Sequence, residues 1–274
     1  MTISASTALC GIVLHPAGHT RSPAMHNAAY AALGLDALYT AFDVPAPRLE
    51  AAMIGVRALG LRQLSVSIPH KTAVLELVDA VDETARRIGA ANTVVLERGR
   101  LVASNTDWLG AIRALESERR LDGARATVLG AGGTARAVVW GLLQRGADVR
   151  VLNRSADRAA ALADELGAKG AGPLEAIAHE RYDVLVNTTS VGMGADESPI
   201  AAADIRPDAV VLDAVYAPEM TRLLRDARER GARIVSGRWM LVHQAVAQLE
   251  AWAGAIDAGV AARAMAEAFG PQPA

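Results

Sequence analysis

The stretch 126–136, Ala-Thr-Val-Leu-Gly-Ala-Gly-Gly-Thr-Ala-Arg, constrains the fold more than any other part of the chain. An apolar run leads into a glycine-rich turn, and a run compatible with a helix follows from Ala135. This is the order of strand, tight turn and helix in a dinucleotide-binding βαβ unit. Gly130 permits the sharp turn, Gly132 lets the backbone approach a pyrophosphate, and Ala135 allows close helix packing. The predicted pyrophosphate site therefore comprises Gly130, Ala131, Gly132, Gly133, Thr134 and Ala135.

The residues after the next predicted strand, 148–152, bear on which dinucleotide binds. An NAD site usually has an acidic residue here for the ribose hydroxyls, whereas this chain reads Asn153-Arg154-Ser155. A guanidinium can bind the 2′-phosphate of NADP in fork geometry. The alternative interpretation is an ordinary loop arginine. Given the glycine turn upstream, we favour NADP as the cofactor and keep NAD as the alternative.

Composition narrows the classes of function. The 274 residues are enough for two ordinary domains, and 51% of them are hydrophobic. The net charge of −2 gives no basic excess that would indicate nucleic acid. The single cysteine, Cys10, excludes internal disulfides and cysteine-cluster metal sites, and the histidines lack metal-ligand spacing. With no signal peptide and no apolar run of transmembrane length, we expect a cytoplasmic protein with no membrane partner.

Strands and helices alternate along the whole chain, which indicates the α/β class. In the first part we expect strands at 9–14, 38–44 and 63–68, helices at 23–34, 47–59, 71–78 and 83–88, and a β-hairpin of 93–96 with 101–103. Ser22 is the expected N-cap of the first helix. In the second part, a helix at 107–121 precedes strands at 126–129, 148–152, 183–187, 209–215 and 233–235. These strands alternate with helices, which predicts a parallel, doubly wound sheet, and helical sequence continues to about residue 269.

Three polar clusters stand at predicted loop positions of the first part. They comprise His19-Thr20-Arg21-Ser22, Ser65 to Lys71, and Asn92 with Asn105-Thr106-Asp107. Ser65 and Ser67 are expected on the same side of one strand, and Lys71 lies just beyond its end. Ligands of α/β sheets bind outside the carboxyl ends of strands. Hydroxyls, amides, one lysine and one aspartate beside a cofactor suit a small polyhydroxylated acid as substrate.

Lys71 and Asp107 are the candidates for proton transfer. Oxidising a secondary alcohol sends a hydride to nicotinamide and requires a group that takes the hydroxyl proton. Lys71 can carry that proton while Asp107 orients it and adjusts its basicity. The structural alternative for Lys71 is a solvated lysine at a helix start, and the alternative for Asp107 is an aspartate that caps a helix. Asp107 can both cap the helix and take part in proton transfer.

Eight motifs, in order along nearly the whole chain, resemble those of the shikimate dehydrogenase family. Residues 19–27 are similar to H-S-x-S-P-x-M-H-N, 65–71 to N-V-T-x-P-x-K, 89–93 to G-A-V-N-T, and 105–107 to N-T-D. Residues 130–136 are similar to G-A-G-G-A-x-R, 153–155 to N-R-[TS], 187–193 to N-x-T-x-x-G-M, and 237–244 to G-x-x-M-L-V-x-Q. On the basis of these motifs, the chain is identified as a member of that family.

The resemblance implies a substrate domain over 1–106, completed by C-terminal helices at 240–274 that return to it. It implies a Rossmann NADP-binding domain over 107–239. The implied substrate ligands are Thr20 and Ser22 for the carboxylate, Ser67, Asn92, Asp107 and Gln244 for ring hydroxyls, and additionally Ser65 and Tyr216. The implied catalytic pair is Lys71 and Asp107. The implied cofactor ligands, besides the glycine turn, are Asn153, Arg154 and Ser155 at the adenosine phosphate and Thr188 and Met240 near the nicotinamide.

The chain also departs from the family's pattern. Ser65 stands at an asparagine position and Ser67 at a threonine position, and Thr20 replaces the first serine. Trp108 occupies a position that is usually glycine, and Arg238 one that is commonly leucine. A bulky ring and an extra cation near the substrate would change specificity, and the alternative is that Trp108 packs between elements and Arg238 lies on the surface. Together these departures point to a divergent paralogue.

We therefore predict an NADP-dependent oxidoreductase that interconverts 3-dehydroshikimate and shikimate. One alternative is a dehydrogenase of quinate or another shikimate-like cyclitol acid that uses NAD or NADP. A second alternative is a non-catalytic NADP-binding sensor, against which the retention of both Lys71 and Asp107 argues. The expected partner is a small-molecule substrate, with no nucleic acid and no metal, and the expected assembly is a monomer or homodimer.

Overall fold

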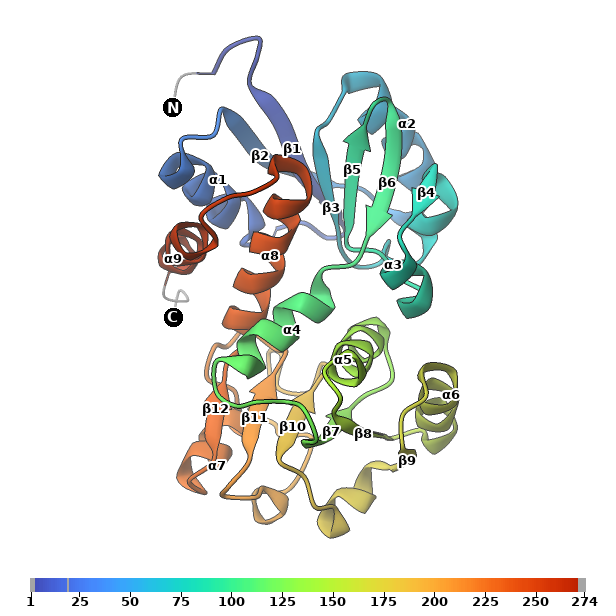
Figure 1. Ribbon diagram of the computed structural model, residues 1–274, viewed down its shortest axis with the longest axis vertical. Coiled ribbons are helices and arrows are strands. Elements are labelled where there is room, and N and C mark those ends of the chain that lie inside the picture. Colours follow the sequence, from blue (N-terminus) through green and yellow to red (C-terminus); the bar gives the residue numbers. More distant parts are fainter. Residues whose placement is uncertain (1–2, 19, 271–274) are drawn as a thin grey trace. The chain divides into compact units, whose positions relative to one another are not determined.

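The computed structural model describes residues 3–18 and 20–270, which separate into two compact units. Unit 1 comprises the residues up to Thr106 together with Gln244–Gly270, and unit 2 comprises Asp107–His243. Each unit contains one six-stranded sheet (Figure 1). The predicted α/β class is confirmed. Among the residues described, no helix combines the length and the apolarity that spanning a bilayer requires.

The sheet of unit 1 is mixed, with the strand order β2-β1-β3-β5-β6-β4. Its strands are β1 (Ala8–Leu14), β2 (Ala37–Asp43), β3 (Gln63–Val66), β4 (Ala80–Val81), β5 (Thr93–Glu97) and β6 (Arg100–Ser104). β1 is parallel to β2 and β3, whereas β5 is antiparallel to both β3 and β6. The predicted hairpin is β5–β6. β4 was not predicted, because its two residues are too few to show a periodic pattern.

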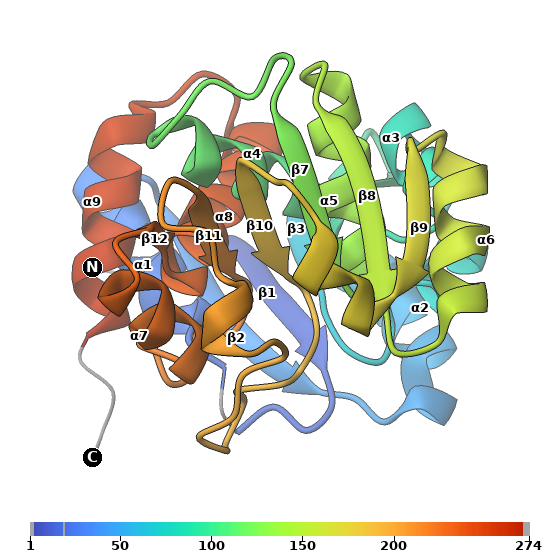
Figure 2. The same cartoon turned by 90° about the horizontal axis from the view of Figure 1, so that it is seen from below.

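Helices of unit 1 pack on this sheet through periodic apolar faces. They are α1 (Ser22–Leu33), α2 (Leu49–Leu59), α3 (Glu83–Ile88) and α9 (Ala258–Phe269), with 3-10 turns η1 (Ala46–Arg48) and η2 (Ala73–Leu77). In α2, Leu49, Met53 and Val56 share one face and join the core around Leu64 and Val94. α1 and α9 lie side by side (Figures 1 and 2).

Two predictions for the helices of unit 1 are wrong in detail. Arg21, not Ser22, is the N-cap of α1, because Ser22 is already inside the helix. The Arg21 side chain makes no capping hydrogen bond, since a guanidinium has no acceptor for the free backbone N–H groups. The expected helix at 71–78 is the shorter 3-10 turn η2. The end of α1 is as predicted, since Gly34 takes the left-handed conformation with φ of 67°.

The sheet of unit 2 is parallel throughout, with the order β12-β11-β10-β7-β8-β9 (Figure 2). Its strands are β7 (Arg125–Leu129), β8 (Asp148–Asn153), β9 (Gly170–Pro173), β10 (Val184–Asn187), β11 (Val210–Asp213) and β12 (Arg233–Val235). The chain runs outward from β7 through β8 to β9, returns to β10 beside β7, and continues to β12. This is the doubly wound order, as predicted. β9 was missed because Gly-Ala-Gly-Pro contains no β-branched residue.

The helices of unit 2 cover its sheet. They are α4 (Asp107–Glu116), α5 (Gly133–Gln144), α6 (Ala156–Leu166) and α7 (Arg222–Glu229), with 3-10 turns η3 (Leu174–His179) and η4 (Ala202–Asp204). In α5, Val138 and Leu142 pack into a core with Val128 and Val151. α4 ends five residues before the predicted 121. Helix α8 (Gly237–Ala253) begins in unit 2 and ends in unit 1.

Candidate functional site

The three polar clusters meet at one edge of the unit 1 sheet. Residues 20–22 follow β1 and residues 67–71 follow β3. Since β5 is antiparallel to β3 and β6, the start of β5 and the end of β6 lie at that same edge. Asn92 immediately precedes β5, and Asn105 and Thr106 follow β6. The topology therefore gathers side chains that are up to 86 residues apart in the sequence (106 minus 20).

Asn92 is the centre of this edge. Its Oδ1 accepts from the Thr106 backbone N–H at 2.8 Å and from the Thr93 hydroxyl at 2.8 Å. Its Nδ2 donates to Gln244 Oε1 at 2.7 Å and to Thr106 Oγ1 at 3.0 Å. Asn92 is buried while Gln244 is half-buried. The amide pair of Asn92 and Gln244 can therefore exchange its mutual hydrogen bond for bonds to ligand hydroxyls without leaving either amide unpaired.

Thr20 and Ser22 place two hydroxyls next to each other at the start of α1. Thr20 Oγ1 lies 3.3 Å from both Ser22 Oγ and the Ser22 backbone nitrogen. Both side chains are half-buried, so they remain accessible to a ligand. Two adjacent hydroxyl donors suit the two oxygens of a carboxylate. The neighbouring His19 of the motif lies outside the described residues.

Lys71 and Asp107 are positioned by different elements. The Lys71 carbonyl accepts from the Ala91 backbone N–H at 2.8 Å, which fixes this part of the chain beside Asn92, and its side chain is half-buried. Asp107 is the first residue of α4 and is only 4% exposed. The positive end of the helix dipole favours a carboxylate at this position.

Ser65 differs from the rest of its cluster. Its hydroxyl accepts from Tyr39 Oη at 2.6 Å and from Gln63 Nε2 at 3.0 Å, and it donates to Gln248 Oε1 at 2.9 Å. A hydroxyl has one donor and two acceptor sites, so all are occupied. Direct contact of Ser65 with substrate stays a prediction; the side chain is 3% exposed and its hydroxyl already makes three hydrogen bonds, which favours a supporting role. Ser67, beyond the end of β3, is half-buried and remains a candidate.

In unit 2, the glycine turn has the geometry that a dinucleotide requires. Gly130 has φ of 112°, and a Cβ there would lie 2.6 Å from Thr188 Oγ1. The Thr188 hydroxyl in turn donates to the Leu129 carbonyl at 2.6 Å, so Thr188 lies directly beside the turn. A Cβ on Gly132 or Gly133 would meet no atom within 4 Å. The turn therefore leaves open space over the N-terminus of α5, where phosphates are favoured.

The end of β8 presents the predicted adenosine-phosphate residues. Asn153 Nδ2 donates to the Ser155 carbonyl at 3.1 Å and shapes this turn. Arg154 and Ser155 are exposed, and Arg154 forms no ion pair with any residue that the structure describes. Its guanidinium is therefore available to an anion. Met240, by contrast, is 7% exposed and packs against the unit 2 core, so little of it can face a cofactor.

A buried polar network that sequence reasoning missed supports the loops after β10 and β11. Asp213 is fully buried, and its carboxylate accepts from Asn187 Nδ2 at 2.9 Å, Thr221 Oγ1 at 2.7 Å and the Val215 N–H at 3.0 Å. Burial raises the pKa of Asp213, against the effect of these hydrogen bonds. These loops carry Thr188 and Tyr216. An aspartate ending an apolar strand was the signal that could have revealed it.

Two departures from the family's pattern have structural roles in unit 2. Trp108 packs on α5 near Gly141, and the Arg145 guanidinium lies 5.7 Å from its ring centroid. Arg238 pairs with Glu219 at 3.4 Å and lies 5.8 Å from the Trp239 ring centroid. The packing interpretation is therefore favoured for Trp108, and the Arg238 charge is compensated.

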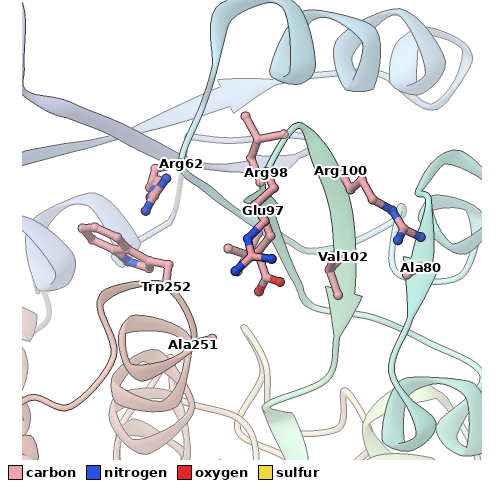
Figure 3. Close-up of a pocket in the computed structure, with 10 residues that line it drawn as sticks. Arg62, Ala80, Glu97, Arg98, Arg100, Val102, Ala251 and Trp252 are labelled. Atoms are coloured by element: carbon pink, nitrogen blue, oxygen red, sulfur yellow. The ribbon is translucent and has the colours of Figure 1, made fainter.

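One cavity of unit 1 is separate from the polar edge. It has a volume of about 650 Å³ and lies around the β5–β6 turn and the end of α8. Figure 3 shows Arg62, Arg98, Arg100 and Glu97 around it, with Trp252 at its side. Because the hairpin turn is at the opposite end of β5 from Asn92, this cavity is not part of the candidate site.

The fold and these two sites define a dinucleotide-binding α/β protein with a second unit that carries a polar ligand site. Residues 12–94 match the family profile described as shikimate dehydrogenase substrate binding domain, and residues 113–196 match shikimate / quinate 5-dehydrogenase. The chain belongs to the shikimate dehydrogenase family.

Similar proteins cover almost the whole chain. The shikimate dehydrogenase (NADP(+)) of Thermococcus kodakarensis is 44% identical over 257 residues, covering 91% of this chain and 92% of that protein. The Methanopyrus kandleri protein of the same name is 45% identical and covers 93% of each chain. The crystal structure of Thermus thermophilus shikimate 5-dehydrogenase in complex with NADP(H) and shikimate is 37% identical with a TM-score of 0.89, covering 95% of this chain and 99% of that one.

Proposed function

We propose that this protein is an NADP-dependent oxidoreductase that interconverts 3-dehydroshikimate and shikimate. The observation that carries this proposal is the edge of the unit 1 sheet, which gathers paired hydroxyls, paired amides and Lys71. Relatives named shikimate dehydrogenase (NADP(+)) match the chain over about nine-tenths of its length. The paired hydroxyls suit the substrate carboxylate, and the amides suit ring hydroxyls. In this proposal unit 1 binds the substrate and unit 2 binds the cofactor.

In the proposed reaction, Lys71 and Asp107 handle the proton. Bound NADP supplies the hydride acceptor or donor at its nicotinamide ring. Lys71 Nζ takes the proton from the reacting hydroxyl in oxidation and returns it to the ketone oxygen in reduction. The Asp107 carboxylate orients the hydroxyl and the ammonium group by accepting hydrogen bonds from them. Thr20, Ser22, Ser67, Asn92, Gln244 and Tyr216 bind and orient the substrate.

The cofactor residues proposed for unit 2 are the glycine turn, the end of β8 and the loop after β10. Gly130–Ala135, at the N-terminus of α5, would hold the pyrophosphate. Arg154 would bind the 2′-phosphate, and Asn153 and Ser155 shape the same turn. Thr188, beside the glycine turn, would contact the nicotinamide side of the cofactor, and Met240 would support that side from the core.

Quinate is the alternative substrate, since the matched family profile includes quinate dehydrogenases. The departures at Trp108 and Arg238 support quinate as substrate less in the structure than in the sequence. Trp108 packs on α5 and Arg238 pairs with Glu219, so both side chains have partners within unit 2. We further propose that the protein acts in the cytoplasm. We also propose that it is a monomer or homodimer, and light scattering on the purified protein would measure the mass of the assembly.

The deciding experiment is a set of initial rates with shikimate and quinate, each with NADP+ and NAD+, followed by the absorbance of the reduced cofactor. We expect the highest kcat/KM with shikimate and NADP+. Preference for quinate would overturn the substrate assignment, and preference for NAD+ would overturn the cofactor assignment. Binding of NADP+ without turnover of either substrate would support the sensor alternative.

A further inference from the structure

Gln248, a residue of α8 for which the sequence predicted no role, lies inside the polar edge of unit 1. It is 3% exposed. Its Oε1 accepts the Ser65 hydroxyl at 2.9 Å, and its Nε2 donates to the Asn92 carbonyl at 2.9 Å. One amide therefore connects α8 to both β3 and the residue that precedes β5. Both contacts are within unit 1, and the Ser65 partner is 183 residues away in the sequence.

Gln244 and Gln248 are one helical turn apart, so they project from the same face of α8. Both reach Asn92, which is held from two sides: Gln244 Oε1 accepts from the Asn92 side chain at 2.7 Å, and Gln248 donates to the Asn92 backbone. The Asn92 carbonyl also accepts from the Val66 N–H at 2.8 Å, at the end of β3. Gln248 thus fixes the rotation of α8 and the strand end that leads into Ser67 and Lys71.

The space for the Gln248 amide exists because residue 65 is a serine. The related motif N-V-T-x-P-x-K has asparagine at this position, and the asparagine side chain carries an amide one bond further from the backbone than the serine hydroxyl. With Gln248 only 2.9 Å from Ser65 Oγ, an asparagine at 65 would overlap it. Two glutamine amides therefore bond to Ser65 Oγ, Gln63 from β3 and Gln248 from α8, and only Gln248 also donates to the Asn92 carbonyl.

The surroundings leave this amide little freedom. Tyr39 and Gln63, which also bond to Ser65, are buried, and the His26 ring stacks on Tyr39 with 4.1 Å between centroids. Burial lowers the pKa of His26 to about 3, against the effect of a hydrogen bond with Gln248. The network is therefore uncharged around neutral pH and does not act as an acid or base.

We propose that Gln248 is a positioning residue that holds Asn92 and Gln244 in the geometry that binds the substrate's ring hydroxyls, and that Gln248 and Ser65 together replace the amide of the motif's asparagine. This proposal rests on the proposed function and adds a specific determinant of substrate affinity to it. Gln248 acts through Asn92 and Gln244, and its amide is fully used within the network.

The first test is Gln248→Met, which keeps the side-chain length and removes both hydrogen bonds. We expect the KM for shikimate to rise about tenfold, while kcat falls less than about threefold, because orientation of the ring hydroxyls and not proton transfer is disturbed. The Kd for NADP+, measured by fluorescence titration, should stay within about twofold, since the glycine turn belongs to unit 2.

Gln144→Met, an exposed change at the end of α5, is the matched control and should leave all values unchanged. An unchanged KM, or a loss confined to kcat, would overturn the positioning role.

The second test is the exchange of the amide between elements. Ser65→Asn alone should lower the unfolding temperature and raise the shikimate KM, because two amides compete for one space. Combining Ser65→Asn with Gln248→Ala should restore the KM to within about threefold of wild type and raise the unfolding temperature above that of Ser65→Asn.

A double variant whose unfolding temperature is no higher than that of Ser65→Asn would overturn the pairing of Ser65 with Gln248, whatever its activity. If wild type turns over neither shikimate nor quinate, the proposed function and the assigned substrate role of Gln248 both fail, while the pairing is still decided by unfolding.

Discussion

At the scale of single residues, exposure distinguishes Ser65 from three of the proposed binding side chains, Thr20, Ser22 and Gln244. Thr20, Ser22 and Gln244 are half-buried, so their polar groups can turn to a ligand. Ser65 is as polar as they are, but its hydroxyl is saturated by three buried partners. Strand alternation placed Ser65 and Ser67 on one side and could not distinguish them, because the difference depends on Tyr39 and Gln248, both remote in sequence.

Lys71 is the residue whose removal should stop the chemistry. We expect Lys71→Met to lower kcat for shikimate oxidation by about 10²–10⁴-fold, the usual range for a lost proton-transfer group. NADP+ affinity should stay within about threefold, because the glycine turn is in unit 2. Initial rates and a cofactor titration on the same preparation measure both. Activity within tenfold of wild type would exclude Lys71 as the proton-transfer group.

Arg154 should determine the choice of cofactor. Arg154→Ser removes a charge-assisted contact worth about 1.5–3 kcal/mol to the 2′-phosphate, so the Kd for NADP+ should rise about 10–100-fold. The Kd for NAD+, which lacks that phosphate, should change less than about threefold. Arg158→Ser, on the exposed surface of α6, is the control for loss of one positive charge. Equal losses for both cofactors would contradict the 2′-phosphate assignment.

At the scale of elements, the strand–turn–helix of β7 and α5 shows two separate uses of glycine. Gly130 is required by the protein itself, because φ is 112° and Thr188 Oγ1 occupies the place of a Cβ. Gly132 has an ordinary extended backbone, and a Cβ there would enter open space. The sequence motif has glycine at both positions. Only the contact between the loop after β10 and the turn distinguishes the role of Gly130 from that of Gly132.

These two glycines predict opposite outcomes for the same substitution. Gly130→Ala should lower the unfolding free energy by about 1–3 kcal/mol, from backbone strain and the close contact with Thr188. Gly132→Ala should change it by less than about 0.5 kcal/mol, yet raise the Kd for NADP+ at least about tenfold, because the methyl group occupies the approach of the pyrophosphate. Urea unfolding and cofactor titration of both variants separate the effects. Full NADP+ affinity in Gly132→Ala would place the pyrophosphate elsewhere.

At the scale of the whole molecule, alternation of strands and helices predicted the topology well because parallel strands joined by helices have few allowed arrangements. It failed where local pattern is weak: in β9, which lacks β-branched residues, and between α8 and α9. There, apolar sequence continues while Gly254, at φ of 78°, and the capping Asp257 end one helix and start the next. Motifs indicated the site residues, but the networks of Gln248 and Asp213 were not predicted, since their partners come together only in the folded sheets.

The stability of unit 2 in acid should depend on one ion pair at the start of two neighbouring strands. Arg125 and Asp183 form paired contacts at 2.9 and 3.1 Å, and the Arg125 side chain holds the pKa of Asp183 at about 2. A carboxyl whose pKa is lowered by folding stabilises the protein above its unfolded-state value near 4, and that contribution is lost as the pH falls through about 2.

Asp183→Asn should therefore reduce the unfolding free energy by about 1 kcal/mol at pH 7, a value that allows for solvent around the half-exposed Arg125. The difference from wild type should shrink between pH 4 and pH 2, so that the two curves of stability against pH converge. Asp122→Asn, in the exposed pair with Arg120, should leave the curve unchanged, because exposed pairs contribute little. Urea unfolding from pH 7 to pH 2 measures both variants. A constant offset at every pH would show that the Asp183 charge is not the source of this stabilisation.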